Sequence, residues 1–194
     1  EQALAYADRP VSVGFNQTAS QPYIVACMTE LLKLTPNDKV LEIATSSGYH
    51  TAILAEIVKE VYTVQIVEEL AATTEQRLQD FGYKNVHMRA GDGFLGWQEH
   101  APYDAILVRG AVAVIPPALL EQLKPGGRMV LPLGVSILQS LTLIEKRADG
   151  TIDQTDVMSV RFMRLLHPGE TAAPSDLPGI IQSIRQVHQH RLPR

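Results

Sequence analysis

The sequence has a single cysteine among its 194 residues, and it lacks both long apolar runs and a strongly basic or acidic composition. One cysteine excludes a disulfide within the chain, and the apolar helical pattern around Cys27 favours a buried structural thiol. No apolar stretch reaches the roughly 18 residues that cross a membrane as a helix, so we expect no membrane partner. Seventeen Lys and Arg against 21 Asp and Glu give a net charge of −4 without a long basic run, which argues against a nucleic-acid partner.

The composition is that of a globular protein with one core. Hydrophobic residues make up 45% and charged residues 20% of the chain. A chain of this length forms one full core, so we predict a single domain over residues 1–166. Residues 167–194 begin with HPGETAAPSDLPG, a Pro/Gly-rich linker, and continue into a tail that we predict to be partly helical. His188 and His190 in this tail are too few ligands for a metal site, and we expect none.

Helical and strand patterns alternate along the chain up to residue 133. Helical spacing indicates helices at 21–34, 48–58, 69–81 and 116–123, and short apolar runs indicate strands at 40–44, 60–66, 86–90, 103–108 and 128–133. This alternation favours a parallel sheet covered by helices on both faces. After Gly134, the runs LQSLTLIEK and TDVMSVRFMRL are joined through Ala148-Asp149-Gly150, which predicts an antiparallel hairpin. We therefore predict an α/β fold that ends in an antiparallel pair.

Candidate ligand-binding residues follow the predicted parallel strands, because open parallel sheets bind ligands at the carboxyl ends of their strands. The loop after residue 44 opens a helix near Gly48, whose free amide groups favour an anion. Gln65 ends the second strand, where a nucleoside-binding fold usually has an acid for the ribose hydroxyls. GDGFLGW supplies Asp92, which can accept a hydrogen bond from an exocyclic amine such as that of adenine. Arg109 follows the fourth parallel strand.

Several stretches of the chain together resemble the protein-L-isoaspartate O-methyltransferase family of class I S-adenosylmethionine-dependent methyltransferases. They are FNQTASQPYIVACMTELL, VLEIATSSGYHTAILAEIV, VYTVQI, AGDGFLGW, YDAILV, IPPALLEQLKPGGRMVLPLG and VRFMRL, and they span about residues 4 to 166. The resemblance implies a Rossmann-like, seven-stranded, mostly parallel sheet with helices on both faces and a C-terminal antiparallel hairpin. It also implies methyl transfer from S-adenosylmethionine to the carboxylate of isoaspartyl residues in proteins or peptides, a repair reaction of the cytoplasm.

The resemblance assigns roles to individual residues. Ser20, in TASQP, matches the family's active-site serine, whose hydroxyl would hold the attacking carboxylate; by its position it is also a candidate cap of the helix that follows. The cofactor residues implied are Glu42, Ala44, Ser46, Gly48, Gln65, Asp92 and Gly93. The substrate-binding residues implied are Thr18, Ser20 and Gln139, and Arg109 is a further candidate because its guanidinium can pair with a substrate carboxylate.

The chain departs from the family pattern in the cofactor motif. Ala44 and Ser46 stand where the family has its first two glycines, and a residue other than glycine at positive φ costs about 1–2 kcal/mol. Gln65 replaces an acid, and Arg109 replaces a small residue, where it is free to pair with a substrate carboxylate, to pair with Glu42 or to reach solvent. One hypothesis is thus an active methyltransferase with a relaxed loop. Another is a non-catalytic protein that has lost the cofactor and binds a peptide, small molecule or partner. A nicotinamide-dependent oxidoreductase fits poorly, because ATSSG lacks the G-x-G-x-x-G pattern.

Overall fold

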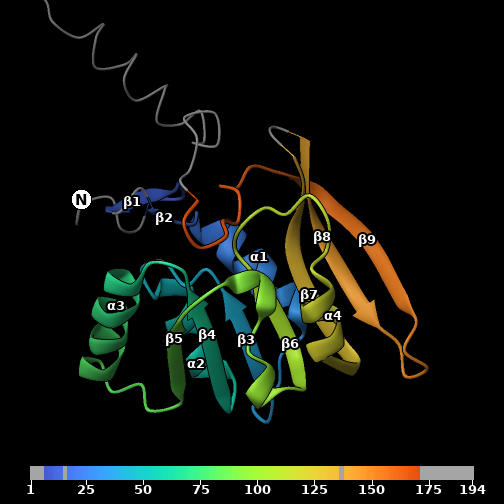
Figure 1. Ribbon diagram of the computed structural model, residues 1–194, viewed down its shortest axis with the longest axis horizontal. Helices are drawn as coiled ribbons and strands as arrows, with labels where there is room; N and C mark the ends of the chain where they lie inside the picture. Colours follow the sequence, from blue (N-terminus) through green and yellow to red (C-terminus); the bar gives the residue numbers. More distant parts are fainter. Residues whose placement is uncertain (1–6, 15–16, 136–137, 171–194) are drawn as a thin grey trace, which may run out of the picture.

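Seven strands form one sheet in the order β5-β4-β3-β6-β7-β8-β9 in the computed structural model, which describes residues 7–14, 17–135 and 138–170 (Figure 1). The strands are β3 (Lys39–Ile43), β4 (Glu60–Gln65), β5 (Val86–Ala90), β6 (Tyr103–Val108), β7 (Leu123–Val135), β8 (Leu138–Lys146) and β9 (Ile152–Val160). Strands β5, β4, β3, β6 and β7 run parallel, whereas β8 and β9 continue the sheet antiparallel. The predicted α/β fold with a C-terminal antiparallel hairpin is confirmed.

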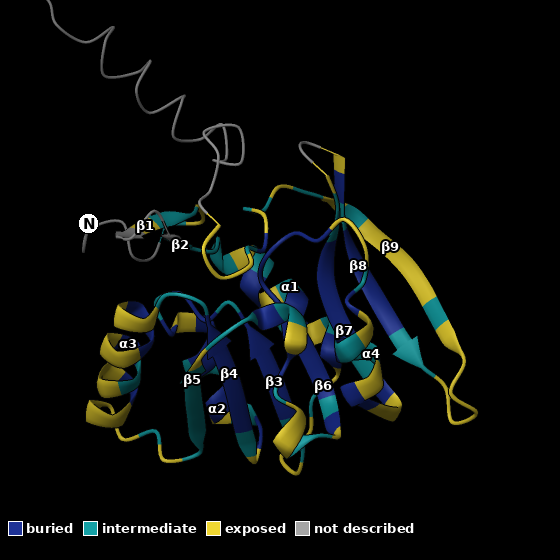
Figure 2. Cartoon of the chain, viewed as in Figure 1, coloured by how far each residue is buried: buried dark blue, intermediate teal, exposed yellow. Residues whose placement is uncertain are grey.

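Helices cover both faces of this sheet. They are α1 (Pro22–Leu32), α2 (Tyr49–Ile57), α3 (Glu68–Asp80) and α4 (Pro117–Gln122). Met28 of α1 and Leu54 of α2 pack in one apolar cluster, and Leu119 of α4 packs in a second cluster across the sheet. Helix α3 lies against β5 and β4. The central strands are buried on both faces, whereas β9 is largely exposed (Figure 2). This burial explains why the central strands read as continuous apolar runs.

The structure adds small elements that the periodicity does not predict. Strands β1 (Val11–Gly14) and β2 (Gln17–Ala19) form a separate antiparallel pair before α1. Two 3-10 helices, η2 (Gly93–Leu95) and η3 (Gln98–His100), connect β5 to β6. These segments are three or four residues long, so they contain too few positions for a period to show.

Several boundaries differ from the prediction for local reasons. Helix α1 ends at Leu32, because Lys33 takes a left-handed φ of 49° and its N–H bonds to the carbonyl of Glu30. Strand β7 begins at Leu123, where the helix was expected to end. Its pairing with β6 shifts register between Tyr103 and Ala105, and this shift accommodates the two glycines of β7 that precede Arg128. The hairpin turn forms as predicted, with Gly150 at a φ of 86°.

The remaining fold predictions concern Cys27 and the chain beyond residue 166. The Cys27 thiol is half-buried against the α1 side of the core, and its burial raises the pKa of the thiol. The structure describes a turn at residues 167–170, while the predicted tail helix lies outside the described residues. The domain boundary at residue 166 stays a prediction. Within the described ranges, no helix is long and apolar enough to cross a bilayer.

Candidate active site

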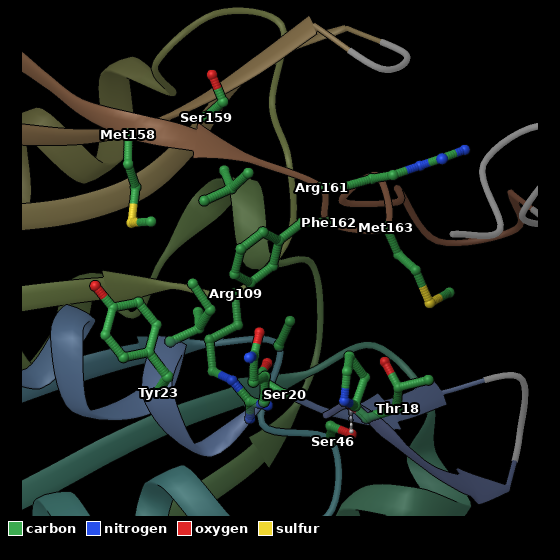
Figure 3. A pocket seen from close by; sticks show the side chains of 15 residues that line it. Thr18, Ser20, Tyr23, Ser46, Arg109, Met158, Ser159, Arg161, Phe162 and Met163 are labelled. Atoms are coloured by element: carbon green, nitrogen blue, oxygen red, sulfur yellow. Dashed lines mark hydrogen bonds between the residues drawn. The ribbon is translucent and has the colours of Figure 1, made fainter. Parts of the chain in front are cut away.

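A hollow of about 450 Å³ opens at the carboxyl ends of β3 and β6 (Figure 3). The segment from β2 into α1 contributes Thr18 and Ser20 to its lining, and the loops after β3 and β6 contribute Ala44, Ser46 and Arg109. Residues 158–163, at the end of β9 and just beyond it, complete the lining. The hollow thus joins five of the residues predicted from sequence with a wall from residues 158–163, for which the sequence predicted no role in the site.

The loop after β3 keeps the backbone shape of a glycine-rich turn although it contains a single glycine. Ala44 and Ser46 have positive φ values of 69° and 56°, and Gly48 has a φ of 82°. Gly48 precedes the first turn of α2, and an added Cβ there would lie 2.7 Å from Cγ2 of Thr74. The Ser46 hydroxyl donates to the carbonyl of Thr18 at 3.2 Å, which ties the loop to β2. The strain expected for these two substitutions is therefore present in the fold.

Arg109 forms a buried ion pair with Glu42. Nη1 of Arg109 lies 3.6 Å from Oε1 of Glu42 and donates to the carbonyl of Thr45 at 2.6 Å. The other carboxylate oxygen, Oε2, accepts from the hydroxyls of Thr51 at 2.6 Å and Thr63 at 2.9 Å. Burial raises the pKa of Glu42, and the positive charge of Arg109 opposes this rise. Of the three placements considered for Arg109, the structure selects the pair with Glu42 and excludes a solvent-exposed side chain.

Ser20 lies at the meeting point of the hollow and this ion pair. Its Oγ accepts from Nη2 of Arg109 at 3.3 Å, and Figure 3 shows the two side chains next to each other. The cap residue of α1 is Gln21 rather than Ser20, and α1 has no side-chain capping bond. The capping role considered for Ser20 is therefore wrong, and the hydroxyl is directed to Arg109 instead.

The carboxyl ends of β4 and β5 hold Gln65 and Asp92. Oε1 of Gln65 accepts from the N–H of Val67 at 3.3 Å, whereas its Nε2 is buried without a hydrogen-bond partner in the described ranges. Oδ1 of Asp92 accepts from the N–H of Phe94 at 2.9 Å, and Oδ2 lies 3.0 Å from Nδ1 of His167, whose ring stacks on Phe94 with centroids 4.0 Å apart. The stretch after residue 166 therefore reaches the predicted adenine turn, a contact that no motif indicates.

Gln139 lies behind the wall of the hollow and is not part of its lining. Its Oε1 accepts from the N–H of Phe162 at 2.7 Å, and its Nε2 donates to the carbonyl of the same residue at 3.1 Å. Phe162 itself lines the hollow. Gln139 thus fixes a lining residue, and its direct contact with substrate stays a prediction.

The threonines around Glu42 are site residues that the sequence interpretation missed. Glu42 and Thr63 are register partners on neighbouring parallel strands, and Thr51 lies one turn into α2. Pairing the two predicted strands residue by residue would have brought Thr63 to Glu42. Among the described residues there is no group of three or more His, Cys, Asp or Glu side chains that could hold a metal ion.

His50 of α2 is a buried imidazole beside this network. Its Nε2 lies 2.8 Å from Oγ1 of Thr29, which itself donates to the carbonyl of Val25 at 2.8 Å, so Nε2 carries the proton. Its Nδ1 has no hydrogen-bond partner among the residues that the structure describes. Burial, and then the positive charge of Arg109, hold the pKa of His50 well below its usual range.

This depressed pKa predicts an acid-sensitive fold. Below the ordinary histidine pKa of about 6.5, His50 is protonated in the unfolded chain but stays neutral in the folded chain. The free energy of unfolding therefore falls as pH falls. One such group contributes at most about 1.4 kcal/mol per pH unit, or about 2 kcal/mol between pH 6.5 and 5. The variant His50→Gln keeps a donor to Thr29 but cannot bind this proton. Urea unfolding at pH 6.5 and at pH 5 should show that the variant loses less stability between the two pH values than the unmodified protein does, by up to that amount. Equal losses in the two proteins would contradict the prediction.

The sheet order, the C-terminal antiparallel strands and a site at the carboxyl ends of β3 and β6 define a methyltransferase-type α/β fold. A solved structure described as protein-L-isoaspartate O-methyltransferase aligns with a TM-score of 0.77 at 25% identity, covering 96% of this chain and 59% of that one. A solved structure from Plasmodium falciparum, described as a protein-L-isoaspartate O-methyltransferase in complex with S-adenosyl-L-homocysteine, shares the fold with a TM-score of 0.73 at 21% identity, over 83% of this chain and 81% of that one.

The chain belongs to the protein-L-isoaspartate(D-aspartate) O-methyltransferase family, whose model matches residues 1–169. It is 52% identical to protein-L-isoaspartate O-methyltransferase 2 of Polaromonas sp., over 83% of this chain and 77% of that protein. It is 56% identical to protein-L-isoaspartate O-methyltransferase 1 of Nitrosospira multiformis, over 84% and 69% of the two chains. The family resemblance predicted from the sequence is confirmed.

Proposed function

We propose that this protein transfers a methyl group from S-adenosylmethionine to the α-carboxylate of isoaspartyl residues in proteins or peptides. The observation that carries the proposal is the hollow at the carboxyl ends of β3 and β6, in which the Ser20 hydroxyl and the Arg109 guanidinium meet. Hydroxyl and guanidinium groups bind carboxylates, and the family of this chain carries out this reaction on such a group.

The residues at the carboxyl ends of β3, β4 and β5 fit S-adenosylmethionine. The buried Nε2 of Gln65 lacks a partner within the described part of the protein and can donate to a ribose hydroxyl. The nine-residue helix α2 directs its first N–H groups toward the loop of Ala44, Ser46 and Gly48, where a methionyl carboxylate can bind. Glu42 lies below this loop, and Asp92 with Gly93 forms the turn at the adenine end. When bound, S-adenosylmethionine supplies an electrophilic methyl group on a sulfonium.

The chemistry requires little of the protein beyond binding and alignment. A carboxylate is ionised at pH 7, so no general base is needed to create the nucleophile. Ser20 and Thr18, at the entrance to α1, are placed to hold the carboxylate, and Met158, Phe162 and Met163 provide an apolar wall that keeps water away. The absence of a His–Asp or Cys–His pair from the sequence motifs is consistent with this reaction.

A second candidate function is ligand binding without catalysis. The positive φ of Ala44 and Ser46 and the guanidinium of Arg109 buried at the end of β6 favour it, because all three lie where the family has small residues. In this case the hollow would bind a peptide, small molecule or partner protein while S-adenosylmethionine no longer binds.

Methyl transfer from labelled S-adenosylmethionine separates the two candidates. We expect base-labile methyl incorporation into an isoaspartyl peptide and much less into the aspartyl peptide of the same sequence. Calorimetry with S-adenosylhomocysteine should show binding by the same preparation. If the protein shows no methyl transfer and no heat of binding at millimolar ligand, the methyltransferase function is rejected and the non-catalytic function remains.

Restoring the glycines, as Ala44→Gly with Ser46→Gly, should strengthen the binding of S-adenosylhomocysteine about tenfold, which corresponds to about 1.4 kcal/mol. The physical reason is the loss of two side chains that line the hollow, together with relief of strain at two positive φ values. Calorimetry measures the affinity. Ala72→Gly, on the exposed face of α3, is the matched control that adds backbone freedom without touching the loop. Unchanged affinity in the double variant would contradict the prediction.

A further inference from the structure

The Arg109 guanidinium has donors that the fold does not use. Nη1 bonds to the carbonyl of Thr45 and faces Glu42. Nη2 has a single acceptor in the described part of the chain, the Ser20 Oγ, and Nε is buried with no hydrogen-bond partner. A guanidinium carries one hydrogen on Nε and two on Nη2, so the Nε–Nη2 edge retains two N–H groups side by side. This edge matches the two oxygens of a carboxylate.

The surroundings of this edge supply directed donors rather than net charge. Glu42 already balances the charge of Arg109, so a bound carboxylate must be held by hydrogen bonds from the free edge and its neighbours. Ser20 accepts from Arg109, which leaves its own hydroxyl hydrogen to donate. Ser20 and Arg109 both line the hollow, and residues 158–163 face them from its other side. Since Nε is shielded from solvent, a ligand reaches the whole edge only by shifting the side chains that cover it.

We propose that Arg109 is the residue that binds the substrate carboxylate in the hollow. Its Nε–Nη2 edge, together with the Ser20 hydroxyl, binds the α-carboxylate of the isoaspartyl residue. This assignment rests on the proposed function and adds a specificity-determining residue to it. The Arg109 guanidinium is fixed at the end of a buried strand by Glu42 and Thr45. A carboxylate on a side chain of different length, as in aspartate, cannot meet the edge and present an oxygen at the same place.

The chemistry predicts which kinetic constant depends on Arg109. The carboxylate loses its negative charge as its oxygen bonds to the methyl carbon, so its interaction with the guanidinium is stronger in the bound substrate than in the transition state. Loss of such an interaction raises KM more than it lowers kcat. A charge-assisted bidentate contact is worth about a 10- to 100-fold change in binding.

The test uses variants that avoid an unpaired buried carboxylate. Arg109→Lys keeps the charge and removes the planar edge, and Glu42→Gln with Arg109→Met removes both charges together. Each is compared with the unmodified protein for KM, kcat and direct binding of an isoaspartyl peptide and of its α-carboxamide analogue. Arg147→Lys, on the exposed β8–β9 turn, is the control for the substitution itself. Affinity for S-adenosylhomocysteine is measured in parallel.

We expect the unmodified protein to bind the carboxylate peptide at least tenfold more tightly than the carboxamide, and both Arg109 variants to lose this preference with a tenfold or larger rise in KM. An unchanged preference in the variants overturns the assignment, as does a larger effect of Arg161→Lys, the other guanidinium of the lining. A weakened affinity for S-adenosylhomocysteine with intact peptide preference assigns Arg109 to the cofactor and also overturns it. Absence of methyl transfer by the unmodified protein rejects the proposed function alone, because the binding comparison still tests Arg109.

Discussion

Replacement of Arg109 by methionine alone is expected to lower the free energy of unfolding by about 3–5 kcal/mol. The substitution leaves the carboxylate of Glu42 buried without its counter-charge, held only by the hydroxyls of Thr51 and Thr63. Two neutral hydrogen bonds do not replace the lost solvation of an ion in this environment. The carboxylate is then forced to bind a proton or to draw water into the core, and either event destabilises the fold.

A double variant distinguishes the contribution of the ion pair from that of side-chain packing. Glu42→Gln combined with Arg109→Met removes both charges at similar volume, so its stability should lie within about 1–2 kcal/mol of the unmodified protein. Urea unfolding of the unmodified protein, the two single variants and the double variant gives the coupling energy of the pair. A double variant as unstable as Arg109→Met would show that the hydrogen bonds of Arg109 to Thr45 and Ser20, rather than the ion pair, carry the effect.

Gly93→Ala is the second change with a large expected effect. An added Cβ would overlap Cγ2 of Ile43, a fully buried residue at the end of β3, so β3 or the η2 turn must shift. Overpacking of this kind costs about 1–3 kcal/mol of stability. Because the turn also positions Asp92, we expect the affinity for S-adenosylhomocysteine to fall tenfold or more.

The same turn offers a matched control. Gly91 lies two residues earlier, its φ is not positive, and a Cβ there would meet its nearest atom, on Val64, at an ordinary 3.8 Å. Gly91→Ala should therefore leave both the unfolding midpoint and the affinity nearly unchanged. Thermal unfolding and calorimetry measure the two quantities. Equal effects at the two positions would mean that added bulk in the turn, and not the contact with Ile43, decides the outcome.

The fold could be predicted from the sequence because its strands show two recognisable patterns. The buried parallel strands, such as β3 and β6, are continuous apolar runs between amphipathic helices, and Asp149-Gly150 marks the hairpin between β8 and β9. Short pieces were not predicted, because β1, β2 and the 3-10 helices contain too few residues to show a period. The early start of β7 was missed for a different reason, since its Pro and Gly residues read locally as a loop.

The candidate site was predictable in its residues but not in its contacts. Topology places Gly48, Gln65, Asp92 and Arg109 at one edge of the sheet, and the structure agrees. Whether Arg109 turns to solvent, to a ligand or to Glu42 depends on side-chain directions across β3 and β6, which periodicity does not encode. The contact of His167 with Asp92 joins residues far apart in sequence, and no local pattern reports such a pair.

The origin of the walls of the hollow has a thermodynamic consequence. Thr18 and Ser20 come from the beginning of the described chain, and Phe162 and Met163 come from near its end. A molecule held between them therefore links segments from near the two ends of the described chain, so unfolding of either segment requires release of the molecule. Resistance to heat or proteolysis gained on adding a ligand would accordingly extend from the first strand to the last, rather than remaining local to the cleft.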